Sequence, residues 1–89
     1  MVNYLNNVRI DEWQSDNEFR VCYLGKGYEC SGFFPKEIIM DGKLEIEILG
    51  LDKSRNLVVV RPVQGKFEET LNGKGVLVRL DDVVYEKVN

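Results

Sequence analysis

Short apolar runs recur along the whole chain and are separated by polar turns. Each run spans four to seven residues and many contain β-branched side chains, whereas Gly, Asn and Asp are frequent between the runs. Runs of this length, bounded by turn-forming residues, are typical of β-strands. The pattern predicts an all-β fold, a small barrel or meander, built as a single domain over residues 1–89.

The first third of the chain predicts three strands after a polar start over residues 3–7. β-branched and aromatic side chains, which favour strands, are enriched in these segments. The loop Gly25-Lys26-Gly27 separates the last two, because glycine adopts positive φ without steric cost. The expected strands cover residues 8–13, 19–24 and 28–34.

Two cysteines flank this loop. If the loop has three residues, Cys22 lies directly opposite Cys30 on one face of the hairpin. The pair could be two small buried hydrophobic side chains, a disulfide, or a redox or metal site. The sequence contains no histidine, which disfavours zinc. Packed free thiols are favoured over a disulfide, because a chain without a secretory signal is expected in a reducing compartment.

The middle of the chain predicts a hairpin and a buried strand. Residues 36–40 form either one helical turn or a short strand, and the hairpin signal Asp41-Gly42 favours the strand. Residues 44–49 alternate between apolar and acidic side chains, so one face should be core and the other wet. The continuous apolar run 57–60 is consistent with a strand buried on both faces.

The last third predicts a second hairpin and a closing segment. Asn72-Gly73 is the strongest two-residue turn signal in the chain and would join strands over 67–71 and 74–80. Residues 83–88 form either a closing strand or a short helix capped by Asp81. The valine pair favours the strand, because β-branched residues lose rotamer freedom in a helix.

Composition excludes membrane-spanning proteins. The chain is 44% hydrophobic and 30% charged, which is ordinary for a globular protein. No segment approaches the roughly 20 apolar residues that a membrane span requires. The N-terminal residues lack the basic and apolar pattern of a secretory signal. We therefore expect a cytoplasmic protein that does not bind a membrane, although a mature exported chain would have the same composition.

The net charge of −3 argues against wholesale binding to nucleic acid, which usually needs a cationic surface. One segment nevertheless carries six cations against two anions, Glu68 and Glu69. An ordinary solvated surface explains this excess, and contact with backbone phosphates is the alternative. The six cations are Lys53, Arg55, Arg61, Lys66, Lys74 and Arg79.

Catalytic motifs are absent from the sequence. Without histidine, the Ser-His-Asp and Cys-His arrangements are impossible. The acid pairs Glu45 with Glu47 and Glu68 with Glu69 are explained by alternation along strands. The two Gly-Lys-Gly sequences have neither the Walker spacing nor a following helix that would bind phosphate. We expect a protein that is not an enzyme and uses no cofactor and no metal.

Aromatic side chains gather around the loop at residues 25–27. Core packing is the favoured interpretation of these side chains. A twisted hairpin exposes alternate residues, however, so some of them could instead stack on bases, hold a methylated cation or bind a peptide. A lone tryptophan is likewise either a core anchor or a binding hot spot. The candidate partner-binding residues are Tyr23, Lys26, Tyr28, Phe33, Phe34 and Trp13.

Two stretches resemble parts of a known family. Residues 36–50, KEIIMDGKLEIEILG, are similar to the central hairpin of the carbon storage regulator family, small dimeric RNA-binding repressors of translation. Residues 76–88, VLVRLDDVVYEKV, resemble the closing strand of that family and the start of its C-terminal helix. The resemblance implies RNA contacts by an arginine in an early strand and another in the closing strand. These positions hold Gly32 and Leu80 here, with Arg79 one place earlier.

The short alternating strands and the Leu-Asp-Asp-Val step near the C-terminus resemble SH3-like and Tudor-like barrels equally well. This resemblance implies a small barrel that can include one short helical turn. The sequence is compatible with two functions. The first is a non-catalytic, regulatory binding module that recognises a protein partner through an aromatic and charged loop face. The alternative is a regulator that binds RNA or DNA through the basic segment between Lys53 and Arg79.

Overall fold

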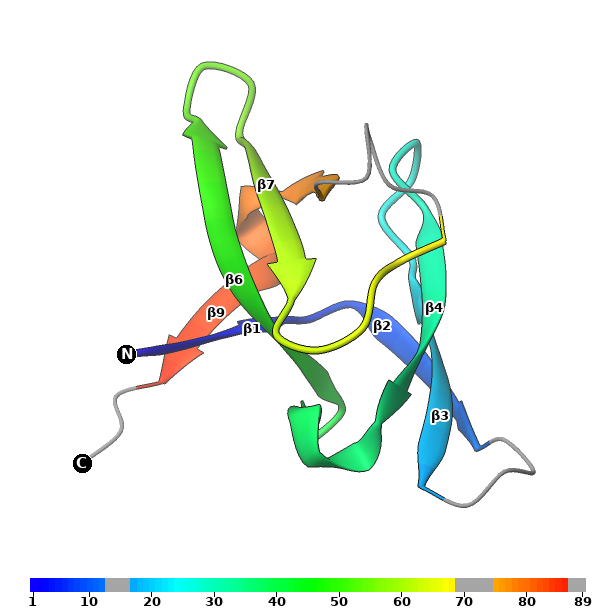
Figure 1. Ribbon diagram of the computed structural model, residues 1–89. Coiled ribbons are helices and arrows are strands. Elements are labelled where there is room, and N and C mark those ends of the chain that lie inside the picture. The colour runs from blue at the N-terminus through cyan, green and yellow to red at the C-terminus, as the bar shows by residue number, and fades with distance from the viewer. Residues whose placement is uncertain (13–16, 69–74, 87–89) are drawn as a thin grey trace.

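Two antiparallel β-sheets make up the computed structural model of the chain (Figure 1), which confirms the all-β prediction. Helical structure in the described part is limited to two 3-10 turns, η1 (Lys36–Ile38) and η2 (Leu80–Asp82). The structure describes residues 1–12, 17–68 and 75–86.

Six strands form the larger sheet. They are β1 (Val2–Leu5), β5 (Ile39–Met40), β6 (Lys43–Asp52), β7 (Leu57–Pro62), β8 (Val76–Arg79) and β9 (Val83–Glu86). The main path has the order β8-β7-β6-β1-β9, and β5 pairs with the start of β6. The first and last strands therefore pair with each other, and η2 connects the two edge strands of the path.

The smaller sheet is inserted between β1 and η1. Its strands are β2 (Val8–Glu12), β3 (Glu18–Tyr23) and β4 (Cys30–Pro35), in the order β2-β3-β4. The three strands predicted for the first third of the chain are confirmed, although the last begins at Cys30 and not at residue 28. Figure 1 shows this sheet beside the larger one, with the segment after β7 crossing from one to the other.

One hydrophobic core is shared by the two sheets. Phe34 of β4 and Leu5 and Leu44 of the larger sheet are each 0% exposed. Phe67, which follows β7, is 1% exposed and meets the Phe34 ring edge to face, with centroids 5.2 Å apart. Such aromatic pairs contribute about 0.5–1.5 kcal/mol beyond the area that they bury. The connection after β7 is thus part of the core.

The segment over residues 36–40 contains both of the predicted alternatives, since η1 is followed directly by β5. Asp41 and Gly42 then have φ values of 51° and 76°, and Met40 pairs with Lys43 across the turn. Positive φ at both central residues is what a type I′ turn requires. The Asp-Gly hairpin signal is therefore confirmed.

The hairpin predicted over residues 67–80 is wrong in its described part. Phe67 and Glu68 belong to no strand, and β8 pairs instead with β7, with Val76 opposite Val60. The ring of Phe67 fills the core, and the apolar run in β7 finds ladder partners on both edges in β6 and β8. The Asn72-Gly73 turn signal lies outside the described residues.

The two ends of the chain differ in how well the sequence predicted them. The closing segment is a strand over Val83–Glu86, as its valine pair favours. The polar start predicted for residues 3–7 is wrong, because Tyr4 and Leu5 are buried in β1 between two strands. Asparagines flank this pair on both sides, so the apolar run is too short to predict a strand.

The predicted pairing of the two cysteines is wrong by one position. Cys22 lies opposite Ser31, and Cys30 lies opposite Tyr23, so the two thiols point to opposite faces of the sheet and form no disulfide with each other. The connection between β3 and β4 is longer than the three residues assumed. Its tight turn is closed by the Tyr28 N–H, which donates to the Gly25 carbonyl at 2.8 Å.

Candidate functional site

Three segments that are distant in the sequence meet at one end of the molecule. They are the β3–β4 loop, the β6–β7 turn and the chain from the last residue of β8 through η2. In Figure 1 the loop and the turn project at the same end, with β8 and η2 between them. We refer to this surface as the loop end, defined as residues 24–29, 53–56 and 79–82. The Leu80 N–H ties two of the segments together by donating to the Asn56 carbonyl at 2.9 Å.

Tyr23 lies in the core beneath the loop end and is hydrogen-bonded to two of its residues. Its side chain is 1% exposed, and its hydroxyl donates to Oδ2 of Asp82 at 2.5 Å while accepting from the backbone N–H of Arg79 at 3.0 Å. Burial, followed by the bond to Asp82, raises the pKa of Tyr23. The prediction that Tyr23 contacts a partner is therefore wrong, because its ring is part of the core and its hydroxyl joins β3 to η2.

Arg79, whose backbone is bonded to Tyr23, has an exposed side chain. Its guanidinium carbon is 5.6 Å from the centroid of the half-buried Tyr28 ring. Its Nη2 donates to the Lys26 carbonyl at 2.9 Å. A cation over an aromatic face contributes about 0.5–1 kcal/mol at an exposed site. The loop end thus brings together Lys26 and Tyr28 from the predicted partner-binding set and Arg79 from the predicted basic set.

The β6–β7 turn adds a second arginine to the same surface. Nε of Arg55 donates to Asp52 at 2.6 Å, and the Ser54 hydroxyl donates to the same carboxylate at 2.6 Å. The bond from Ser54 and then that from Arg55 lower the pKa of Asp52 to about 2. The hydrogen bond to Asp52 in turn raises the pKa of Arg55.

The remaining aromatic candidates do not join this surface. Phe34 is 0% exposed, so its assignment as a partner-binding residue is wrong. Phe33 is its neighbour in β4 and points to the outer face, where it is 37% exposed and lies opposite Arg20. Neighbours in a strand point to opposite faces, which explains the difference. Trp13 lies outside the described residues.

The predicted basic segment does not form one stripe along the described surface. Arg61 is paired across the sheet with Glu47, at 2.8 Å between Nη2 and Oε2. It lies four residues beyond Leu57, the ladder partner of Arg79, which separates the two arginines by about 13 Å at the usual rise of a strand. Lys66 is in the connection after β7, Lys53 is exposed in the β6–β7 turn, and Lys74 lies outside the described residues.

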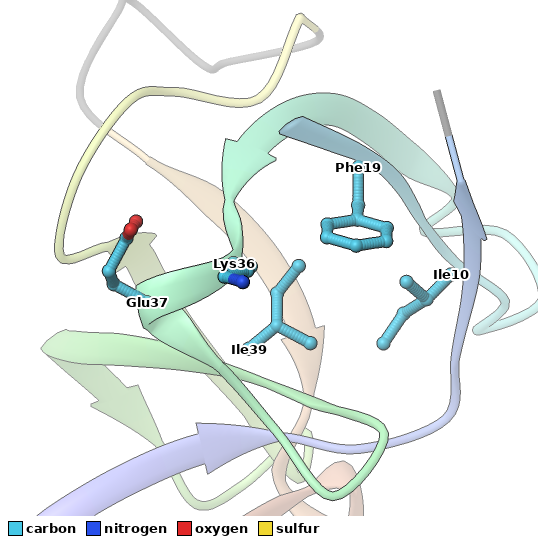
Figure 2. Close-up of a pocket in the computed structure, with 5 residues that line it drawn as sticks. All are labelled: Ile10, Phe19, Lys36, Glu37 and Ile39. Atoms are coloured by element: carbon cyan, nitrogen blue, oxygen red, sulfur yellow. The ribbon is translucent and has the colours of Figure 1, made fainter. Parts of the chain in front are cut away.

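A second candidate is an open apolar hollow of about 390 Å³ at the opposite end of β3. Figure 2 shows Ile39 directed toward the ring of Phe19, with Ile10 beside that ring. The volume falls at the lower end of the range of about 300–1,000 Å³ that is typical of ligand pockets. No sequence pattern predicts this site, because its residues come from both sheets and from η1, which only the fold brings together. The hollow is lined by Ile10, Phe19, Lys36, Glu37 and Ile39.

The described residues show no group of three or more His, Cys, Asp or Glu side chains that could hold a metal ion. Within the same residues, no helix has the length and apolar character needed to cross a membrane. Comparison with protein-family models, with curated proteins and with solved structures finds no match. The resemblances to the carbon storage regulator family and to SH3-like or Tudor-like barrels stay predictions.

Proposed function

We propose that this chain is a non-catalytic, regulatory binding module that recognises a protein partner through the loop end. The observation that carries the proposal is the contact between Arg79 and Tyr28, two residues of types that are enriched in binding hot spots. The arginine is exposed, and the ring and the Lys26 carbonyl hold it in place. Side chains ordered before binding lose less conformational entropy when a partner arrives.

The distribution of charge favours a protein over a nucleic acid. A phosphate backbone binds a row of cations and releases counterions along it. Here Arg61 is neutralised by Glu47, and it lies about 13 Å from Arg79 along the strands. The loop end also contains the carboxylates of Asp81 and Asp82. A compact surface of mixed charge around one aromatic ring suits a protein interface.

The proposal is tested by capture from native cell extract with the tagged chain as bait, with parallel detection of protein and RNA. We expect a protein partner that is retained at high salt, lost with Arg79→Ala and kept with Arg61→Ala. Arg61→Ala is the matched control, because it removes a surface arginine from the neighbouring strand of the same sheet. RNA recovered alone, released by salt and weakened equally by both variants, would contradict the proposal and support the nucleic-acid alternative.

A further inference from the structure

Arg79 differs from the other positioned arginines in what holds it. Arg9, Arg55 and Arg61 each form an ion pair with a carboxylate of this chain. Arg79 forms no ion pair with the described residues and is held by an aromatic ring and a backbone carbonyl. The charges of Arg9, Arg55 and Arg61 are balanced internally. Among the described residues, the charge of Arg79 is balanced by no carboxylate.

The two carboxylates that follow Arg79 most closely in the sequence are already engaged by neutral donors. Asp82 accepts from the Tyr23 hydroxyl at 2.5 Å, and Asp81 accepts from the side-chain amide of Asn56 at 3.1 Å. The loop end therefore contains acidic groups close in sequence to Arg79, but their bonds are directed elsewhere. This arrangement keeps the guanidinium exposed.

The unused donors of Arg79 form a fork. A guanidinium carries five N–H donors in a rigid plane, and within residues 1–12, 17–68 and 75–86 the Arg79 side chain donates one hydrogen bond, to the Lys26 carbonyl. The fork matches two carboxylate oxygens, and paired charge-assisted bonds of this kind are the stronger hydrogen bonds in proteins. Lys26 is also exposed, so its ammonium adds positive charge beside the fork.

We propose that the loop end recognises an acidic segment of its protein partner, with one Asp or Glu carboxylate bound in the fork of Arg79. This inference rests on the proposed function and specifies its ligand. Tyr28 keeps the guanidinium plane in place while the carboxylate binds at the free edge, and Lys26 attracts the next acidic residue of the segment.

The test uses two short fluorescein-labelled peptides, one of alternating Glu and Ala and one of alternating Gln and Ala, together with a labelled oligouridylate of similar length. Fluorescence anisotropy should show binding of the Glu peptide and little binding of the other two probes. Arg79→Ala should lower the affinity for the Glu peptide by about tenfold or more, as expected for loss of a charge-assisted pair. Arg79→Lys, which keeps the charge but not the fork, should recover only part of the affinity, and Arg61→Ala should change it by less than about twofold.

The comparison of Glu with Gln peptides needs no protein variant, so the inference can be overturned even if a variant fails to fold. Equal binding of the two peptides, tighter binding of oligouridylate, or equal loss with Arg61→Ala would each overturn it. The two proposals also fail separately. If the captured protein partner depends on Arg79 but the Glu peptide does not compete with it, the acidic ligand is wrong and the protein-binding function stands. If capture does not depend on Arg79, both are wrong.

Discussion

The hydroxyl of Tyr23 accepts a hydrogen bond from the backbone N–H of Arg79 at 3.0 Å, which links the core of the smaller sheet to the exposed arginine at the end of β8. The same hydroxyl donates to Asp82, so one buried group fixes both ends of a short connection. The position of the Arg79 backbone is therefore set by the core. This relationship explains how a surface site on a small fold can be ordered before a partner binds.

Removing the Tyr23 hydroxyl should destabilise the fold. Tyr23→Phe leaves the Asp82 carboxylate and the Arg79 N–H without their partner, and leaving such groups unpaired costs about 1–3 kcal/mol. Urea unfolding measures the change. Tyr85→Phe is the matched control, because Tyr85 is 64% exposed. This substitution should change the free energy of unfolding by no more than about 0.5 kcal/mol. Equal stability of the two variants would show that the Tyr23 hydroxyl does not form these two hydrogen bonds.

The same hydroxyl predicts a loss of stability at alkaline pH. Because the pKa of Tyr23 is raised above its ordinary value of 10.0, the unfolded chain ionises first as pH rises. Its contribution is therefore present below pH 10.0 and is lost above it. The difference in free energy of unfolding between the wild-type chain and Tyr23→Phe should be constant near neutral pH and shrink at alkaline pH. A difference that grows with pH would contradict the assignment.

Gly25 should tolerate no larger side chain. A Cβ built on Gly25 would lie 2.5 Å from atoms of the Tyr23 ring, whereas one built on Gly50 meets nothing within 4 Å. We expect Gly25→Ala to lower the free energy of unfolding by about 1–3 kcal/mol through overpacking. Gly50→Ala, the control, should be nearly neutral. Thermal unfolding of both variants decides this, and a neutral Gly25→Ala would mean that the loop does not pack on Tyr23.

The Asp52 carboxylate should titrate at unusually low pH. Its pKa of about 2 depends first on the Ser54 hydroxyl, so Ser54→Ala should raise that pKa toward the ordinary value of 3.8. The carboxyl carbon chemical shift of Asp52, followed by NMR across acidic pH, gives the value directly. Because the folded-state pKa is lowered, the contribution of this group to stability is present above pH 3.8 and is lost as pH falls toward 2. An Asp52 pKa that is the same with and without Ser54 would contradict the hydrogen bond.

The two thiols should differ in reactivity in the folded protein. Cys22 is half-buried and Cys30 is 5% exposed, and neither forms a disulfide. A thiol reagent should label Cys22 faster under native conditions, and both at similar rates in denaturant. Cys22→Ser should abolish the faster phase. Equal labelling rates in the native wild-type chain would show that the two thiols are equally accessible. That result would contradict the observed register, in which Cys22 and Cys30 point to opposite faces.

Local signals predicted the local structure well. Asp41-Gly42 specified its own turn through the φ values that it tolerates. The alternation over residues 44–49 correctly predicted a strand with Leu44 and Ile46 in the core, but Ile48, expected on the same buried face, is 41% exposed. These features depend on neighbours in the sequence. The strand over Val2–Leu5 was missed because its stability comes from pairing with β6 and β9, which no short window contains.

The candidate site was harder to predict for a related reason. Tyr23 is the last residue of β3 and is buried, whereas Tyr28 belongs to the loop that follows, which is longer than the glycines suggested. The contact of Tyr28 with Arg79 joins segments that only the sheet topology brings together. The sequence thus supplied the residue types of the site, whereas long-range strand pairing decided which of them meet.

The most direct test of the loop end as the binding surface is an NMR map of amide shifts as the captured partner is added to the labelled chain. We expect the largest changes to fall within residues 24–29, 53–56 and 79–82 and to disappear with Arg79→Ala. Changes centred on Phe19, Lys36 and Ile39 of the apolar hollow, with the loop end unaffected, would contradict it.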